Sequence, residues 1–327
     1  MADLSTTYLG LKLKNPIIVA SSGLTDSIDG IVRFEQHGAA AVVLKSLFEE
    51  QIQMDVDSQR MNNSFDTYTD VENYIGFYTK RHNLSNYTTL IKEAKQKVNI
   101  PIIASVNCVS SEEWPSFAKQ IEDAGADALE LNMFIMPSDS SVTGREIEQV
   151  YLDIIEKVKQ QVSIPLALKV HHYFSGFANF AEELSNTGIG GLVLFNRFYQ
   201  PDVDLDSEKI VSSHIYSYPE ENAMVIRWLG ILAGKINCDL AATTGIHDGK
   251  TVLKNLLVGA KAVEISSVIY KKGAQVIEEM LAEMNKWLDE HSYASVSSIV
   301  GKLKQSELIK PMVYERAQFM RYFSDAK

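Results

Sequence analysis

Residues 239–267 read DLAATTGIHDGKTVLKNLLVGAKAVEISS, with two short apolar runs on either side of a helical segment. The first run, Asp239–Ala242, is followed by Thr243-Thr244-Gly245, and the second, Ala262–Ile265, by Ser266-Ser267. An apolar run, a small-residue turn, a helix and another apolar run form the pattern of a parallel βαβ unit. The stretch therefore predicts two parallel strands with polar residues at their carboxyl ends.

The same alternation extends through the rest of the chain. The runs are apolar on both faces of the pleat, as strands covered by helices must be. Thr143 and Glu146 predict a capping box for a helix that extends to Gln160, and Glu112–Ala124 predicts another helix. Eight strands that alternate with helices favour a closed TIM (β/α)8 barrel over an open doubly wound sheet. The six other runs are Pro16–Ala20, Ala41–Leu44, Ile102–Val106, Ala128–Leu131, Leu166–Leu168 and Gly191–Phe195.

Composition narrows the class of protein. The length of 327 residues suits one barrel over 1–327, with 309–327 as a C-terminal extension. Two smaller domains would also fit this length, but no linker-like stretch divides the chain. A net charge of −11 argues against nucleic-acid and anionic-membrane partners, and no apolar run is long enough to span a bilayer. Cys108 and Cys238 lie far apart without zinc spacing, so we expect no metal and a cytoplasmic location.

Two connections are too long to be plain loops. Residues 46–86 follow the second predicted strand and residues 197–222 follow the sixth, so both lie at the mouth of the barrel. In the second connection, Asp202, Asp204 and Asp206 alternate with Val203 and Leu205, which indicates a hairpin. Long loops at this face usually cover a ligand, and the alternative is a packing or oligomer contact.

Polar residues follow every apolar run, and in a barrel these positions form one ring around one mouth. A lysine directly after a buried strand loses solvation unless it meets an anion or an electron-rich ligand. We therefore interpret the ring as a ligand site rather than as a structural ion pair. In chain order its members are Ser21-Ser22-Gly23, Lys45-Ser46, Asn107, Asn132, Lys169, Asn196, Thr243-Thr244-Gly245 and Ser266-Ser267.

The ring has two chemically different sides. The small residues after the seventh and eighth runs lead into helices expected at Asp248 and Gly273, an arrangement typical of barrel phosphate sites. Lys45, Asn132, Lys169 and Asn196 would surround the rest of the ligand. This division suits FMN, and a lysine near N1 would stabilise the anionic reduced flavin. An alternative is a lyase or aldolase in which Lys169 forms a Schiff base.

At these residues the chain resembles the dihydroorotate dehydrogenase family, in particular its soluble class 1 members. The resemblance implies an FMN barrel that oxidises dihydroorotate to orotate in pyrimidine biosynthesis, with hydride passing from substrate to flavin N5. A small-molecule substrate and a homodimer are expected. The matching segments include Asn15-Pro16, Lys45-Ser46, Glu130-Leu131-Asn132, Leu168-Lys169, Asn196, Thr244-Gly245-Ile246 and Gly301-Lys302-Leu303-Lys304.

The resemblance and the ring together give a set of expected site residues. The expected catalytic residues are Lys45, Asn132, Lys169 and Ser138. The expected cofactor contacts are Ala20, Ser21, Lys45, Ser46, Asn107, Asn132, Lys169, Asn196, Thr244, Gly245, Ser266 and Ser267.

The chain departs from the family in its substrate half. The loop after the fourth strand reads NMFIMP over residues 132–137, with no cysteine or serine base before Ser138. Residues 73–78, NYIGFY, replace the family's substrate-binding run, and the usual Gly-Gly pair is replaced around Tyr216–Pro219. Ser138, or one of His171 and His172, is a candidate for a displaced base. A further alternative is a flavin-binding member whose substrate specificity is lost or altered.

Overall fold

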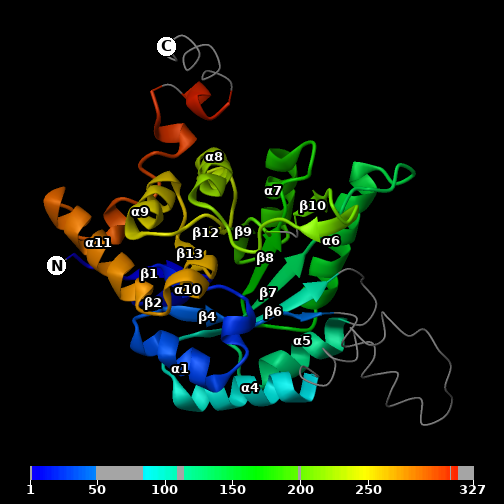
Figure 1. The fold of residues 1–327 in the computed structure, drawn as a ribbon, viewed down its shortest axis with the longest axis horizontal. Coiled ribbons are helices and arrows are strands. Elements are labelled where there is room, and N and C mark those ends of the chain that lie inside the picture. Colours follow the sequence, from blue (N-terminus) through cyan, green and yellow to red (C-terminus); the bar gives the residue numbers. More distant parts are fainter. Residues whose placement is uncertain (1, 49–83, 109–113, 198–199, 310, 316–327) are drawn as a thin grey trace.

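The structure, a computed structural model, describes residues 2–48, 84–108, 114–197, 200–309 and 311–315. Within them, eight parallel strands form a ring that closes where β4 pairs with both β3 and β6, and helices surround it (Figure 1). The predicted TIM barrel is confirmed. The barrel strands are β3 (Ile17–Val19), β4 (Ala41–Val43), β6 (Ile102–Cys108), β7 (Ala128–Met133), β8 (Leu166–Val170), β9 (Gly191–Leu194), β12 (Asp239–Thr243) and β13 (Ala262–Ile265).

The helices pack their apolar stripes on the outside of the barrel. In α6 the predicted capping box is present, because the Thr143 hydroxyl accepts from the Glu146 N–H and the Glu146 carboxylate accepts in return. The helices are α1 (Ile28–Gln36), α4 (Leu84–Lys97), α5 (Trp114–Asp123), α6 (Gly144–Lys159), α7 (Phe177–Asn186), α8 (Asn222–Leu232), α9 (Gly249–Val258), α10 (Ser267–Lys272) and α11 (Val276–Glu290). Single 3-10 turns occur at Gly23–Thr25, Pro219–Glu221, Val296–Ser298, Gln305–Glu307 and Pro311–Tyr314.

A hairpin that the sequence analysis did not anticipate closes the amino-terminal end of the barrel. It consists of β1 (Thr6–Tyr8) and β2 (Leu11–Leu13), joined by Leu9 and Gly10 at φ angles of 54° and 73°. Two consecutive residues with positive φ are typical of the tight turns that join antiparallel strands. Tyr8 and Leu9 are buried in one cluster with inward-facing barrel residues such as Ile103, so this end is filled and the mouth lies at the other end.

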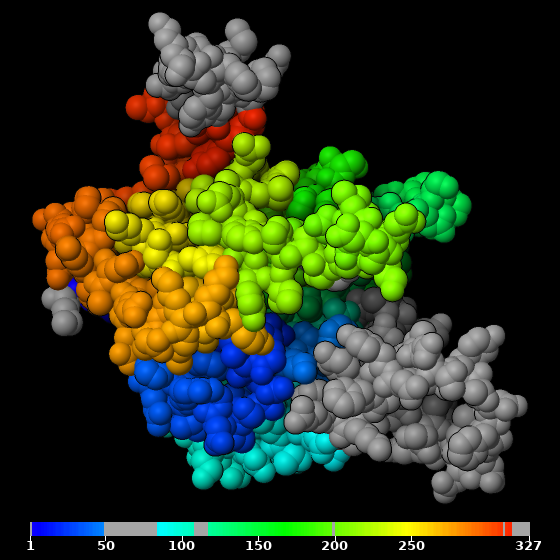
Figure 2. All heavy atoms as spheres, viewed as in Figure 1, coloured from blue at the N-terminus to red at the C-terminus, as the bar shows by residue number. Residues whose placement is uncertain are grey.

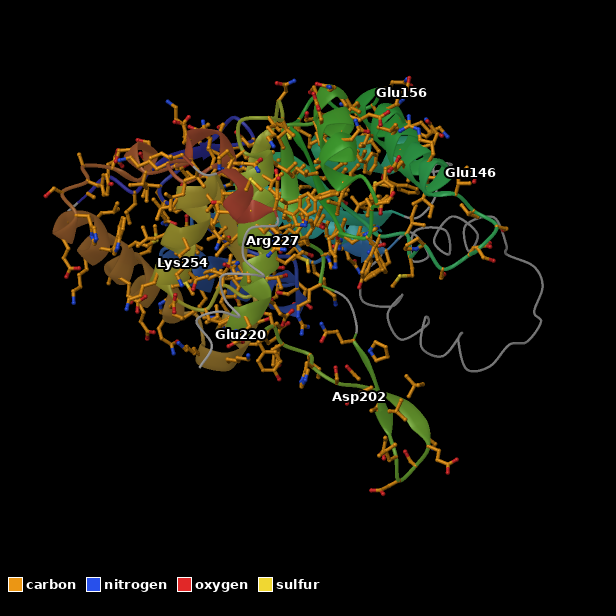
Figure 3. The ribbon with its side chains drawn as sticks, turned by 90° about the horizontal axis from the view of Figure 1, so that it is seen from above. Glu146, Glu156, Asp202, Glu220, Arg227 and Lys254 are labelled. Atoms are coloured by element: carbon orange, nitrogen blue, oxygen red, sulfur yellow. The ribbon has the colours of Figure 1, made fainter. Side chains whose placement is uncertain are left out.

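The predicted hairpin after β9 is also present, as β10 (Pro201–Asp204) and β11 (Lys209–Ser212). Asp202 lies on this hairpin, which extends away from the barrel (Figure 3). The predicted helix at Glu112–Ala124 is confirmed from Trp114 to Asp123. Most of the connection 46–86 and of the extension 309–327 lies outside the described residues.

Candidate functional site

A cavity of about 760 Å³ opens at the carboxyl ends of the barrel strands. Its wall is built mainly by residues at or directly after the ends of β6, β7, β8, β9, β12 and β13, because parallel strands bring their carboxyl ends to one rim. Its volume is within the usual range for small-molecule and cofactor sites. The ring of polar strand ends is therefore one concave surface.

Nearly all of the expected cofactor contacts line this cavity. They come from segments up to 247 positions apart in the chain (267 − 20), which the barrel brings together. The predicted residues in the wall are Ala20, Ser21, Asn107, Asn132, Lys169, Asn196, Thr244, Gly245, Ser266 and Ser267.

Lys45 and Ser46 are the expected contacts that the structure does not place in this wall. The second strand does not end at Lys45: it resumes as β5 (Leu47–Phe48), which pairs with β6 beyond β4. Ser46 lies in this interruption, where its N–H donates to Ser21 Oγ at 3.0 Å. Lys45 Nζ lies 3.9 Å from Asp26 Oδ2. Because this strand continues to pair after Lys45 and Ser46, the rim of the cavity lies beyond these two residues.

The turn after β12 is shaped for close approach of its backbone. Thr244 and Gly245 both have φ of 74°, a conformation that is uncommon for threonine. A Cβ atom on Gly245 would lie 2.5 Å from the Asn222 backbone nitrogen, so only glycine fits. The Asn222 amide, which is 2% exposed, donates to the Thr244 carbonyl at 3.1 Å and holds the turn in place.

The two helices behind this turn begin differently. α9 follows Asp248, whose carboxylate accepts from the Thr251 N–H at 2.7 Å, as expected for a capped helix. The helix after β13 was expected near Gly273, but α10 begins at Ser267, directly at the strand end. Ser266 and Ser267 therefore form the start of α10 in the cavity wall rather than a loop.

The segment 214–218 packs against this side of the cavity. Ser217 donates its N–H to Ser267 Oγ at 3.0 Å, and its carbonyl accepts from Lys271 Nζ at 2.9 Å. In Figure 2 the surface of residues 200–221 (yellow-green) lies directly against that of α10 (orange). The segment is thus attached to α10 through its backbone at Ser217.

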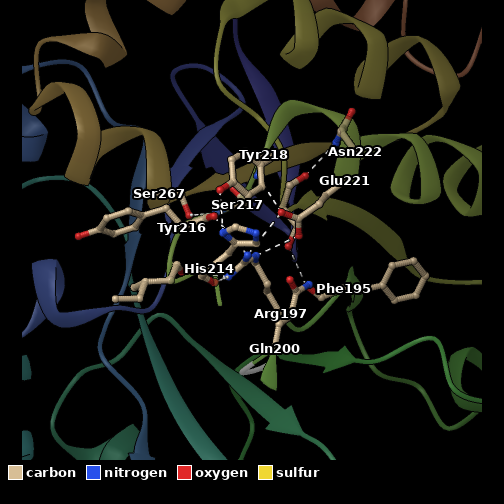
Figure 4. A network of polar contacts seen from close by, with 12 residues as sticks. Phe195, Arg197, Gln200, His214, Tyr216, Ser217, Tyr218, Glu221, Asn222 and Ser267 are labelled. Carbon is tan, nitrogen blue, oxygen red and sulfur yellow. Dashed lines mark hydrogen bonds and ion pairs between the residues drawn. The ribbon is translucent and has the colours of Figure 1, made fainter. Parts of the chain in front are cut away.

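Arg197 holds the same segment from the opposite side (Figure 4). Its Nε donates to Glu221 Oε2 at 2.9 Å, and its Nη1 donates to the carbonyls of His214 and Ile215 at 3.0 and 2.9 Å. One guanidinium thus joins the end of β9 to the start of the segment and to Glu221, which follows it. Because Arg197 and Ile215 also line the cavity, this network forms part of its rim.

Amide side chains form the other side of the cavity. Asn196 Nδ2 donates to Asn132 Oδ1, which links the ends of β9 and β7. Asn196 Oδ1 is buried and accepts no hydrogen bond within the described part of the chain. A buried carbonyl oxygen without a donor is costly, and a ligand N–H in the cavity would satisfy it.

Lys169 lies at the inner end of the cavity between two buried glutamates. Its Nζ lies 2.6 Å from Glu264 Oε2 and 3.5 Å from Glu130 Oε1, and both glutamates are 1% exposed. Burial alone would lower the pKa of Lys169, but the two carboxylates outweigh burial and raise it above the ordinary value. Lys169 is therefore held as an ammonium ion.

The loop after β7 contributes an aromatic ring to the cavity. Phe134 lines the cavity, whereas Met133 is buried in the core and Ile135 packs against it. Ser138 is exposed, and it is absent from the described cavity walls. The structure does not bring Ser138 together with Asn132 and Lys169.

A second cavity of about 800 Å³ adjoins the first and shares Phe195, Asn196 and Arg197 with it. His172 lines this second cavity. His171 instead is fully buried and stacks on Phe174 with a ring separation of 4.4 Å. Burial, with a smaller effect of His172, lowers the pKa of His171 to about 4. As expected for adjacent residues, the two histidines point into different surroundings, and His171 has a packing role.

Three charged residues at or beside the cavity, Glu264, Glu130 and Arg197, were not among the expected site residues. A signal for the two glutamates was available, because each is a single charge inside an otherwise apolar strand, A-V-E-I and A-L-E-L. A charge is buried in a strand only with a partner. Arg197 follows Asn196 in an ordinary loop sequence, and only the path of the chain reveals its role.

The fold and the cavity define a (β/α)8 barrel protein with a ligand site at the usual rim. The family model described as dihydroorotate dehydrogenase matches residues 3–288. The chain is similar to proteins named dihydroorotate dehydrogenase B (NAD(+)), catalytic subunit. The one from Thermoplasma volcanium is 28% identical and that from Thermoplasma acidophilum 25%; the alignments cover 92% of this chain and 98% and 99% of the relatives. The relative from Pyrococcus abyssi is 25% identical, with coverage of 91% and 98%.

The chain belongs to the dihydroorotate dehydrogenase family. It is thus a flavin-dependent dehydrogenase of the class that acts on CH–CH donors in pyrimidine biosynthesis. Among the described residues, no group of three or more His, Cys, Asp or Glu side chains could hold a metal ion. No helix in the same part of the chain is long and apolar enough to cross a membrane.

Proposed function

We propose that the chain binds FMN in the cavity at the barrel rim and oxidises a small cyclic substrate at a CH–CH bond. The observation that carries this proposal is the two-sided cavity. On one side are the backbone turns at Thr244-Gly245 and Ser266-Ser267, and on the other are asparagine amides and an ammonium group. A phosphate suits the first side, and a polar heterocycle suits the second.

The chain's own residues have separable roles in this proposal. Backbone N–H groups at Thr244-Gly245 and Ser266-Ser267 bind the phosphate, and the Asn196 carbonyl accepts from a ring N–H. Lys169 favours an anionic ring at the inner end of the cavity. Phe134 and Phe195 supply apolar wall that excludes water. FMN, when bound, supplies a hydride acceptor at N5.

We propose that the substrate differs from dihydroorotate, or that dihydroorotate is turned over slowly. The supporting observation is Phe134, because the loop that carries the base in the family presents a phenyl ring to this cavity. A phenyl ring cannot accept a proton, and loss of a general base typically costs 10²–10⁴-fold in rate. An apolar wall also suits a donor less polar than dihydroorotate.

The Schiff-base alternative has less support. A lysine that forms a Schiff base must lose its proton, and such lysines usually have a lowered pKa. Here the two glutamates raise the pKa of Lys169, and Glu264 holds its ammonium group at 2.6 Å. We therefore assign Lys169 to charge stabilisation.

FMN binding has a direct test. The protein is purified, any flavin is released by denaturation, and chromatography identifies it against FMN and FAD standards. We expect FMN, before or after reconstitution, since the described chain offers a phosphate turn and no dinucleotide GxGxxG fold. Recovery of FAD, or no flavin after reconstitution, would contradict the proposal.

We also propose a cytoplasmic location, supported by two cysteines without a disulfide-like pattern.

A further inference from the structure

The cluster of Lys169, Glu130 and Glu264 contains more carboxyl groups than cations. The three side chains come from β8, β7 and β13 and point into the barrel, and all are largely buried. If both glutamates were ionised, the cluster would have one uncompensated negative charge. Such a charge in a buried site costs several kcal/mol and is usually removed by uptake of a proton.

One carboxyl oxygen of each glutamate also lacks a hydrogen-bond donor. Glu264 Oε2 accepts from Lys169, whereas Oε1 of Glu264 and Oε1 of Glu130 are buried and accept no hydrogen bond among the described residues. Burial and then the charge of Glu264 raise the pKa of Glu130 well above its ordinary value, although Lys169 acts in the opposite direction. A proton held between the carboxyl groups would supply the missing donor.

Other charged groups lie further along the barrel interior and do not compensate this charge. Tyr8, from the hairpin at the closed end, is buried and its hydroxyl accepts and donates no hydrogen bond among the described residues. Its pKa is raised well above the ordinary value, first by burial and then by Glu264, Glu130 and Asp239. Tyr8 stays neutral and Asp239 is an acid, so neither residue supplies positive charge. Lys169 is therefore the cation that faces the two glutamates.

We propose that Glu130 and Glu264 retain one proton between them at neutral pH, so that they present a single negative charge, which neutralises Lys169. Glu264 forms the ion pair and Glu130 holds the proton. The pair is then a positioning and charge-setting element: it draws the ammonium group into the barrel and limits its effect on a ligand in the cavity. Glu264 itself reaches the cavity wall, whereas Glu130 lies deeper.

This arrangement predicts that either glutamate can replace the other. In Glu264→Gln, Glu130 loses its proton and pairs with Lys169; in Glu130→Gln, Glu264 keeps the pair. The cluster stays neutral in both single variants. Only the double variant Glu130→Gln/Glu264→Gln leaves the ammonium group without a counter-charge.

The retained proton is measurable by infrared spectroscopy on the purified full chain, with or without flavin. At pH 7 we expect a carboxylic acid C=O band that both single variants lack. Glu156→Gln, an exposed glutamate on α6, is the matched control and should keep the band. A wild-type spectrum that is identical to those of both single variants would overturn the proposal.

A second measurement rests on the proposed FMN site. The ratio of the dissociation constants of oxidised and reduced FMN is compared in wild type, both single variants and the double variant. We expect the double variant to favour the reduced form by about tenfold more than wild type, equivalent to about +30 mV for a two-electron couple. The single variants should stay near wild type. If each single variant shifts the ratio by about half as much as the double variant does, both glutamates are ionised in wild type and the proposal is wrong.

The flavin-free protein distinguishes this proposal from the FMN proposal. A raised folded-state pKa of Glu130 stabilises the fold fully below its unfolded value of about 4.5, and this stabilisation is lost as pH rises through the folded-state pKa. The unfolding free energy of wild type relative to Glu130→Gln should therefore fall as pH rises above 4.5. A flat difference contradicts the retained proton, whereas a chain that binds no FMN but shows this slope contradicts only the FMN proposal. If the double variant does not fold, the single variants decide the outcome.

Discussion

The sequence alone led us to expect Lys169 among the flavin contacts, where a lysine near N1 would stabilise the anionic reduced flavin. In the structure Lys169 lines the cavity, and its Nζ lies 2.6 Å from Glu264 Oε2 and 3.5 Å from Glu130 Oε1. A charge that is paired inside the barrel acts on a ligand less than an unpaired one, since the fields of opposite charges partly cancel. The function of Lys169 therefore depends on residues that lie on two other strands.

Replacing Lys169 by methionine tests its role at the residue scale. We expect a loss of about 3–5 kcal/mol in unfolding free energy at pH 7, because the substitution leaves a buried carboxylate without its partner. The FMN midpoint potential should become more negative, and the change should be larger at pH 8 than at pH 6, where proton uptake neutralises the remaining charge. Redox titration and denaturant unfolding measure the two effects. An unchanged potential at pH 8 with normal FMN occupancy would place Lys169 away from the flavin.

At the scale of elements, the connection from β7 to α6 decides what the site can do chemically. The strand delivers Asn132 and then Phe134 to the cavity, while Ser138 lies on the exposed part of the loop. The loop is anchored because Tyr151 of α6 accepts the Ile135 N–H at its hydroxyl, at 3.2 Å. This anchor keeps the segment after Phe134 outside the first cavity.

We expect dihydroorotate to reduce the bound flavin slowly or not at all, because the loop after Asn132 offers Phe134, Ile135 and Met136 and no cysteine or serine base before Ser138. Anaerobic stopped-flow mixing, followed by flavin bleaching, measures the rate. Ser138→Ala should leave the rate unchanged, and Phe134→Cys should raise it if only the base is missing. Rapid bleaching by wild type that Ser138→Ala abolishes would show that the loop refolds inward and that Ser138 is the base.

At the scale of the whole molecule, the β10–β11 hairpin is the feature that the barrel does not explain. All of its strand residues are exposed, and Val203 and Ile210, which pair in register, are 53% and 67% exposed. An isolated two-stranded hairpin is marginally stable in water and needs cover on its apolar face. We propose that a second copy of the chain covers this face in a homodimer.

Light scattering during size-exclusion chromatography tests this assembly. Wild type should elute with the mass of two chains, and Val203→Asp/Ile210→Asp should elute as a monomer, because the charges oppose burial of the hairpin face. Glu156→Gln, on exposed α6 surface, serves as the control and should remain dimeric. A monomeric wild type, or a dimer that survives the double substitution, would contradict the hairpin interface.

Within one copy, we propose that the chain forms a single domain over residues 1–327.

The apolar strands and the polar residues that follow them were readable from the sequence, because local pattern alone specifies both. Each of the eight predicted runs overlaps a barrel strand, and ten expected contacts line one cavity, since closure of a parallel sheet always brings strand ends together. Lys45 and Ser46 lie outside this wall because their strand continues as β5, and that continuation depends on pairing with β6, which no local pattern encodes.

What the tertiary structure alone decided is which charges meet. Glu130, Lys169 and Glu264 are separated by 39 and 95 positions (169 − 130 and 264 − 169), and only barrel closure places their side chains in contact. The same holds for Arg197 and the segment around Ile215. Electrostatic energy depends on distance and burial, and the order of residues in a chain specifies neither until the fold has formed.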